Sequence, residues 1–186
     1  MFNGGPFLSM NYSVTFESLA SFGYIVVAPM SCVILWCEFF PYDLLQGIKG
    51  PFNNPDMHPI FARADFTATG IFGHSMGGDA VTRLATWKED VVTYNIKAAV
   101  GLFPGIAADP LTYPSTIHVP YFFVTGTGDN IVSDTGIYKY YSEDPTNPKV
   151  YADFEGAEHN DPTNLSHMHS LGYMIQFFEC HLRGEK

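Results

Sequence analysis

The sequence is poor in cysteine, in basic residues and in long apolar runs, and each shortage excludes a class of protein. Its three cysteines, Cys32, Cys37 and Cys180, allow at most one disulfide and match no metal-binding spacing, so we interpret them as core thiols and expect no metal site. Nine basic residues stand against 19 acidic ones, and the net charge of −10 disfavours nucleic acids and anionic membrane surfaces as partners. No run reaches the roughly 20 apolar residues of a membrane helix.

The length and composition are those of one globular domain. With 186 residues, 46% of them hydrophobic and 15% charged, the chain can bury a core and is not of the disordered type. Residues 1–6 (MFNGGP) have neither the basic nor the apolar region of a signal peptide. We therefore expect a single domain over residues 1–186, and the cellular compartment stays open.

Five short apolar runs bounded by Gly or Pro predict strands that are buried on both faces. They are Tyr24–Ala28, Thr69–Gly73, Lys97–Phe103, Tyr121–Thr125 and Lys149–Phe154. Apolar residues at helical spacing predict helices at Val14–Ser21, Ala80–Trp87 and Leu171–Leu182. Strands that alternate with helices predict an α/β fold of three layers with a mostly parallel sheet. Residues 50–66, rich in Pro and Asn, are expected to form a long loop.

The most specific motif is the G-x-S-x-G pattern of residues 73–77 (GHSMG), which lies between a predicted strand and a predicted helix. A serine on a sharp strand-to-helix turn exposes its hydroxyl, and small residues at Gly73 and Gly77 allow the neighbouring backbone to approach. The next helix directs its N–H groups toward the reacting carbonyl. The pattern predicts Ser75 as a nucleophile and the Met76 N–H as an oxyanion donor.

A serine hydroxyl is a weak nucleophile and needs a base, which in turn needs an orienting acid. Asp129 and His159 each follow a predicted strand, at the carboxyl ends of the strands, where parallel sheets have their active sites. We predict that His159 is the base and Asp129 the acid, with Asp134 as the alternative acid and Asp153 as a structural residue. The other histidines are interpreted as exposed, packing or helix-terminal residues: His58, His118, His167, His169 and His181.

A second oxyanion donor is expected from a glycine-rich loop near the amino end. The segment Asn3–Pro6 precedes the first predicted helix, and proline has no N–H to donate. Gly5 is therefore the candidate donor, with Phe7 as the alternative.

Four stretches together resemble the dienelactone-hydrolase-like and polyester-hydrolase branch of the α/β hydrolases, which includes cutinase-like and polyethylene-terephthalate hydrolases. They are LASFGYIVVAP (19–29), ADFTATGIFGHSMGGDA (64–80), VPYFFVTGTGDNIV (119–132) and FEGAEHND (154–161). The resemblance implies the α/β-hydrolase fold, no cofactor and a triad of Ser75, Asp129 and His159. It also implies oxyanion donors at Gly5 and Met76, and substrate-binding positions at Phe7, His74 and Gly105.

The chain departs from this family pattern in two ways. Glycine stands at positions 5 and 105, where the family usually has an aromatic residue and a tryptophan. The family also has strands ahead of the oxyanion loop, including a central strand that would lie between Tyr24–Ala28 and Thr69–Gly73. We therefore expect a chain truncated at its amino end, with the gap filled by a rearranged strand or by self-association; secretion is compatible with such a truncation.

The spacing of the later motifs bears on the substrate. Only about fifteen residues, 104–118, separate two predicted strands, which leaves no room for a cap domain. The cleft should therefore be open, lined by Phe7, Phe103 and Tyr113, and suited to bulky or polymeric esters. We expect a serine hydrolase that cleaves carboxylic esters through an acyl-enzyme. The alternatives are a non-catalytic binding module on the same fold, and acyl transfer or perhydrolysis.

Overall fold

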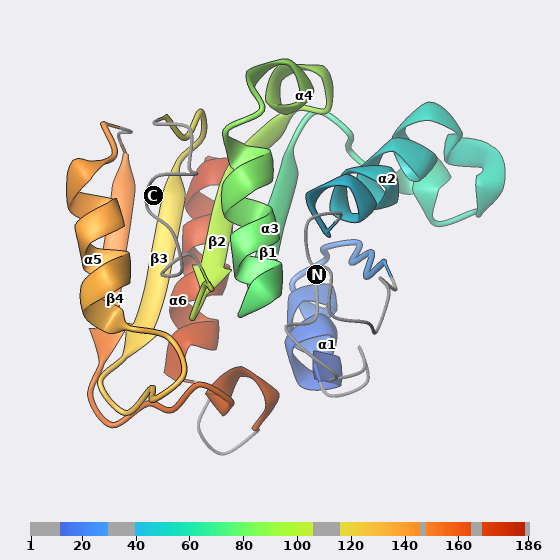
Figure 1. Cartoon of the computed structure of the whole chain (residues 1–186). Helices are drawn as coiled ribbons and strands as arrows, with labels where there is room; N and C mark the ends of the chain where they lie inside the picture. Colours follow the sequence, from blue (N-terminus) through green and yellow to red (C-terminus); the bar gives the residue numbers. More distant parts are fainter. Residues whose placement is uncertain (1–11, 30–39, 106–115, 146–147, 165–168, 185–186) are drawn as a thin grey trace.

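The computed structural model describes residues 12–29, 40–105, 116–145, 148–164 and 169–184, and these form an α/β architecture (Figure 1). Four parallel strands make one sheet in the order β1-β2-β3-β4. Their bounds are Thr69–His74 for β1, Ile96–Leu102 for β2, Tyr121–Gly126 for β3 and Lys149–Phe154 for β4. Four of the five predicted strands are thus confirmed, each to within one residue at either end.

Helices cover both faces of this sheet (Figure 1). On one face lie α2 (Phe40–Asn53), α3 (Met76–Ala85), α4 (Lys88–Thr93) and α5 (Asp134–Glu143). On the other face lie α1 (Ser13–Ser21) and α6 (His169–Phe178), and α6 continues into a π-helical turn, η7 (Glu179–Arg183). Short 3-10 turns complete the described elements: η3 (Pro55–Met57), η4 (Phe61–Arg63) and η6 (Asp161–Thr163). The predicted three-layer α/β fold is confirmed.

The strands β1, β2 and β3 are largely apolar because both of their faces are buried. Successive side chains of a strand point to opposite faces, so neighbours enter different cores. Ile71 packs with α3 and α5 in one cluster, whereas Phe72 packs with α1 and α6 in the other. In β3, Phe123 and Phe122 divide in the same way. The prediction of burial on both faces is wrong for β4, in which Val150 and Asp153 are exposed.

The prediction of a strand at Tyr24–Ala28 is wrong. This segment has no regular secondary structure and pairs with no strand among the described residues. A cavity of about 360 Å³ lies between it and β1, with Ile25, Gly70 and Phe72 among its lining residues. The apolar composition correctly indicated a partly buried segment, but a strand also needs a neighbour for its backbone.

The long loop predicted for residues 50–66 is also wrong in its first part. Helix α2 continues to Asn53 with Pro51 inside it, and η3 and η4 add two short helical turns before residue 66. The helices α2, α4 and α5 are not among the predicted helices, and α3 begins at Met76 rather than Ala80. Cys180 is exposed, so its assignment as a core thiol is wrong. Cys32 and Cys37 lie outside the described residues.

Within the described ranges, we find no helix with the length and apolar character that a membrane span requires.

Candidate active site

Ser75 stands on a sharp turn between β1 and α3, in a backbone conformation that side chains rarely adopt. Its φ is 55° and its ψ −122°. A Cβ added to Gly73 would lie 2.2 Å from the carbonyl oxygen of Gly77, and one added to Gly78 would lie 2.7 Å from the Cα of Pro104. The strained turn therefore exists only because these positions carry no side chain.

In the predicted triad, His159 lies within hydrogen-bonding distance of both Ser75 and Asp129. His159 Nε2 is 2.9 Å from Ser75 Oγ, and His159 Nδ1 is 2.7 Å from Asp129 Oδ2. The side chains of His159 and Asp129 are only 7% and 2% exposed, while Ser75 is half-buried. A carboxylate can only accept, so Nδ1 carries the ring proton of a neutral His159 and Nε2 is left to accept from the serine hydroxyl.

Backbone groups hold the carboxylate of Asp129 in place. Its Oδ1 accepts hydrogen bonds from the N–H groups of Ile131, at 2.8 Å, and Val132, at 2.9 Å. Its Oδ2 then faces His159. The carboxylate therefore orients the imidazole from a fixed position.

The loops that carry Asp129 and His159 are joined to each other. The N–H of Gly128 donates to the carbonyl of Ala157 at 3.0 Å, and the N–H of Gly156 donates to Thr127 Oγ1 at 2.8 Å. A Cβ on Gly126 would lie 2.3 Å from that same carbonyl oxygen of Ala157. The loop of Asp129 and the loop of His159 are therefore fixed against each other by these contacts.

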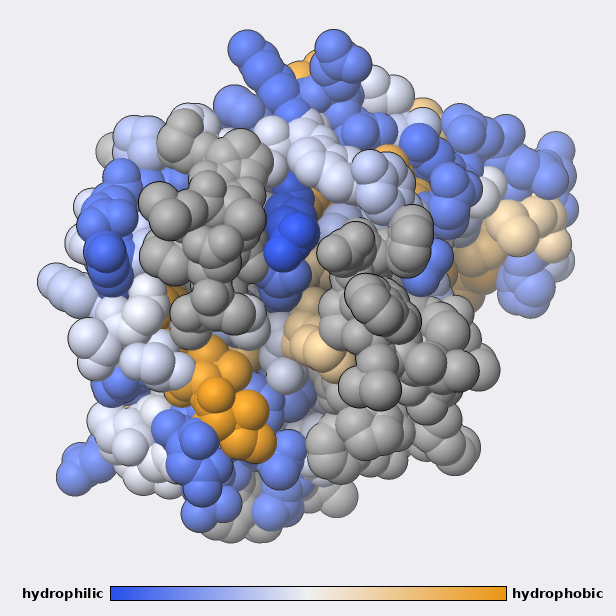
Figure 2. Space-filling view, viewed as in Figure 1, coloured by the Kyte–Doolittle hydropathy of each residue, from blue (hydrophilic) through white to orange (hydrophobic). Residues whose placement is uncertain are grey.

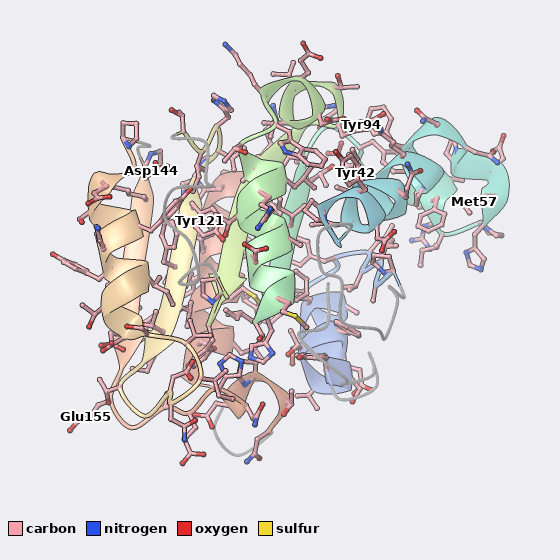
Figure 3. All side chains as sticks on the ribbon, viewed as in Figure 1. Tyr42, Met57, Tyr94, Tyr121, Asp144 and Glu155 are labelled. Atoms are coloured by element: carbon pink, nitrogen blue, oxygen red, sulfur yellow. The ribbon has the colours of Figure 1, made fainter. Side chains whose placement is uncertain are left out.

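The site lies at the end of the sheet where the parallel strands finish. Glu155, which directly follows β4, and Asp144, which precedes it, lie at opposite ends of the sheet in Figure 3. Ser75, Asp129 and His159 follow the carboxyl ends of β1, β3 and β4. Parallel α/β sheets carry their functional loops at this end, where the strands have their carboxyl termini.

The predicted oxyanion and substrate-binding residues are only partly described. Met76 is the first residue of α3, which places its N–H at the positive end of the helix. Gly105 lies beside it, and its N–H donates to the Ser75 carbonyl at 2.9 Å. Gly5, Phe7 and Tyr113 lie outside the described residues.

His74 and Phe103 are packed behind His159. Phe103 is only 2% exposed, so it does not line an open cleft as predicted, and its ring centroid is 6.1 Å from that of His159. His74 is fully buried, which argues against the predicted substrate-binding role. Its Nδ1 is 2.7 Å from Tyr12 Oη, and its Nε2 is 2.7 Å from the carbonyl oxygen of His159. Burial and, secondly, the proximity of His159 lower the pKa of His74 to about 3.

The alternative residues lie elsewhere. Asp134 begins α5 and accepts from its neighbour Thr135, while Asp153 accepts from Thr125 within the sheet. His58 and His118 are exposed, as expected for His58. His181, in η7, packs on the ring of Phe177 in α6, and burial lowers the pKa of His181. His167 lies outside the described residues, and His169 is the first residue of α6.

Asp79 is a buried carboxylate near the start of α3 that the sequence patterns do not single out. Its Oδ2 accepts from Arg83 Nε at 2.9 Å, but its Oδ1 has no hydrogen-bond partner among the described residues. Burial raises the pKa of Asp79 to about 6, against the opposing effect of Arg83. Among the described residues, no group of His, Cys, Asp and Glu side chains is placed to hold a metal ion.

Comparison with known proteins gives relatives in sequence and in fold. No protein-family model matches the chain. Cutinase 1 of Thermobifida cellulosilytica and the cutinase of Thermobifida fusca strain YX are each 25% identical over 168 residues, which is 88% of this chain. The chain spans 61% and 53% of those two proteins, respectively. A crystal structure from Agrobacterium vitis, assigned as a hydrolase, superposes with a TM-score of 0.64 at 10% identity, over 97% of this chain and 85% of that one.

Proposed function

Since the chain is an α/β hydrolase with cutinase-like sequence, we propose that it is a serine hydrolase that cleaves carboxylic esters through an acyl-enzyme. One observation carries the proposal: the unbroken chain of contacts from Ser75 Oγ to His159 Nε2, and from His159 Nδ1 to Asp129 Oδ2. A serine with an aligned base and an orienting acid is the arrangement that acyl transfer requires.

In the proposed first step, Ser75 Oγ attacks the ester carbonyl while its proton moves to His159 Nε2. Asp129 stabilises the imidazolium that forms, because its carboxylate already accepts from Nδ1. When the tetrahedral intermediate collapses, the imidazolium returns the proton to the departing alcohol. A water molecule then loses a proton to His159 as it attacks the acyl-serine. The imidazolium passes that proton to Ser75 Oγ as the acid leaves, which restores the enzyme.

The negative oxygen of the tetrahedral intermediate needs donors at a fixed position. The Met76 N–H is our candidate, because it opens the ten-residue helix α3 directly after the nucleophile. Gly5, outside the described residues, remains the candidate for a second donor. Loss of one such donor typically costs about 10²–10³-fold in kcat.

The proposed substrates are bulky or polymeric esters with an apolar part. Figure 2 shows apolar surface at the end of the molecule where the strands finish. Ile131, two residues after Asp129, is 65% exposed there. A large exposed aliphatic side chain beside a catalytic acid offers a surface on which an apolar acyl or alcohol group can rest. Gly105 lies against the backbone of Ser75 and Met76, and its lack of a side chain keeps this position small.

Labelling with a fluorophosphonate probe, followed by peptide mapping, tests the proposal directly. We expect a single modified residue, Ser75, and no labelling in Ser75→Ala, whose kcat should fall about 10⁶-fold. Ser142→Ala, on an exposed position of α5, is the control and should label normally. A folded wild-type chain that does not react would contradict the proposal and favour a non-catalytic binding module.

Product analysis separates hydrolysis from acyl transfer. With an ester substrate in water that also contains a competing alcohol or peroxide, a hydrolase yields mainly the free acid. A new ester or a peracid as the main product would instead assign the chain to acyl transfer or perhydrolysis.

A further inference from the structure

His74 is hydrogen bonded at both of its ring nitrogens, and both partners bear on the active site. It is the last residue of β1 and its side chain is fully buried. On one side it meets the hydroxyl of Tyr12, a fully buried residue at the start of α1. On the other side it meets the main-chain carbonyl of His159.

The direction of both hydrogen bonds follows from the chemistry of the groups. A carbonyl oxygen can only accept, so Nε2 of His74 carries a proton and donates to His159. In the neutral ring Nδ1 is then an acceptor, and Tyr12 Oη donates to it. The low pKa of His74 keeps the ring neutral above about pH 3. The arrangement is therefore Tyr12 O–H to His74 Nδ1, and His74 Nε2–H to the His159 carbonyl.

The neutrality of His74 matters because His159 becomes a cation during the proposed reaction. The centroids of the two rings are only 4.8 Å apart. A second imidazolium at that distance would oppose protonation of the base. A second proton would have to bind at Nδ1 of His74, and the hydroxyl of Tyr12 already donates to that nitrogen. Besides the imidazole of His159, the carboxylate of Asp129 also acts electrostatically on His74.

We propose that Tyr12 and His74 form a positioning relay for the base, a role that rests on the proposed function. Asp129 fixes the imidazole of His159 at Nδ1, and His74 fixes the main chain of the same residue. With both ends held, Nε2 stays aligned with Ser75 Oγ. Misplacement of a reacting group by about 1 Å can cost 10²-fold in rate, so the loss of the main-chain anchor should slow the chemical step.

The first test replaces the ring and keeps or removes its donor. His74→Gln retains an N–H that can reach the carbonyl, whereas His74→Leu does not. We expect His74→Leu to lower kcat on a soluble p-nitrophenyl ester about 10–100-fold with little change in KM, because the buried ring touches no substrate. His74→Gln should recover most of that loss. Equal activities of the two variants would overturn the proposal.

The second test covers the case in which His74→Leu does not fold. Tyr12→Phe removes only the hydroxyl, and its matched control is Tyr121→Phe. Tyr121 is an equally buried tyrosine whose hydroxyl contacts Thr82 at 2.6 Å in the core on the opposite face. We expect Tyr12→Phe to lower kcat about 2–10-fold, the range of one hydrogen bond, and Tyr121→Phe to lower Tm without changing kcat.

The failures of the two proposals can be told apart. If wild-type protein does not react with a fluorophosphonate at Ser75, the proposed function fails. If wild-type protein reacts and both Tyr12→Phe and His74→Leu react at the same rate, the positioning relay fails while the esterase proposal stands.

Discussion

Gly73 and Gly77 approach each other so closely that a side chain at position 73 would disrupt the turn that carries Ser75. A Cβ on Gly73 would lie 2.2 Å from the Gly77 carbonyl oxygen, which is backbone and cannot swing away. The geometry explains the spacing of the motif: the first glycine accommodates the return of the chain into α3, and the serine between them takes up the strained conformation at φ 55°.

Gly73→Ala should therefore abolish activity and destabilise the fold. We expect a loss of at least about 1–3 kcal/mol in the free energy of unfolding, because the added methyl displaces the first turn of α3. Chemical denaturation and an ester-hydrolysis assay measure the two effects. Gly172→Ala is the control: this glycine is inside α6 with open space around it, so the change should stabilise by about 0.5–1 kcal/mol. Full activity in Gly73→Ala would contradict the role of the turn.

Asp129→Asn should lower kcat about 10⁴-fold while Ser75 and His159 stay in place. The amide nitrogen of asparagine donates a hydrogen bond and cannot accept one. When it faces Nδ1, it favours the tautomer in which Nε2 carries the proton, and Nε2 then cannot take a proton from the serine. Asp134→Asn is the matched control, since this carboxylate lies in α5 and contacts its own neighbour instead. Steady-state kinetics on both variants decide which carboxylate is the acid. A large loss with Asp134→Asn and none with Asp129→Asn would reverse the assignment.

The positions that could be predicted from sequence are those where one local rule determines the outcome. The buried strands are visible because continuous apolar runs, such as β3, suit a sheet covered on both faces. Ser75 could be predicted because its turn needs glycines at fixed spacing, and Asp129 and His159 because each lies in the loop that follows a strand. For these residues, local pattern and tertiary placement agree.

The misjudged positions depend on partners that are distant in sequence. Tyr24–Ala28 has the composition of a strand, but whether it becomes one depends on a neighbouring backbone. The role of His74 depends on Tyr12, 62 residues earlier, and on a carbonyl 85 residues later. No local signal in a G-x-S-x-G motif reveals that its second residue contacts the main chain of the base.

Ile131→Ser should weaken binding of bulky apolar esters more than that of small ones. The side chain is 65% exposed beside Asp129, so the substitution removes apolar contact area without opening the core. We expect a loss of about 1 kcal/mol, a roughly fivefold rise in KM, for a long-chain p-nitrophenyl ester and little change for the acetate. Ile60→Ser, 45% exposed near η4, is the control. A uniform change in KM for both esters would argue against Ile131 as a substrate contact.

The stability of the protein should depend on the charge of Asp79. Its pKa is about 6 in the folded chain against an ordinary value of 3.8, so the folded state binds more protons between these values and loses stability as the pH rises through them. Asp79→Asn removes this dependence. Its free energy of unfolding relative to wild type should increase by roughly 2 kcal/mol between pH 4 and pH 7.

Urea denaturation across this pH range measures the effect. His74, whose pKa is lowered on folding, has the opposite influence, but it is common to both proteins and cancels in the difference. Glu89→Gln, at an exposed position of α4, controls for the loss of one negative charge. A constant difference between Asp79→Asn and wild type from pH 4 to pH 7 would contradict the raised pKa.

The outer edge of β1 should mediate self-association. Thr69 and Ser75 donate their N–H groups toward β2, so the alternating backbone groups of Gly70 and Phe72 face the cavity, where no described strand pairs with them. An unpaired edge beside apolar side chains is a template for another strand. We therefore expect the chain to exceed its monomer mass in light scattering, and the amides of Gly70 and Phe72 to exchange slowly with deuterium.

A charge placed on the wall of the cavity should reverse that association. Ile25 is 36% exposed and lines the cavity, and a lysine there would be disfavoured once a strand covered it. Ile25→Lys should shift the mass toward the monomer and speed exchange at Gly70, whereas Val92→Lys, 68% exposed on α4, should change neither. A wild-type monomer in which the Gly70 amide exchanges rapidly would show that the edge stays open. A monomer in which that amide is protected would show that the chain itself supplies the strand, and either result would exclude association through β1.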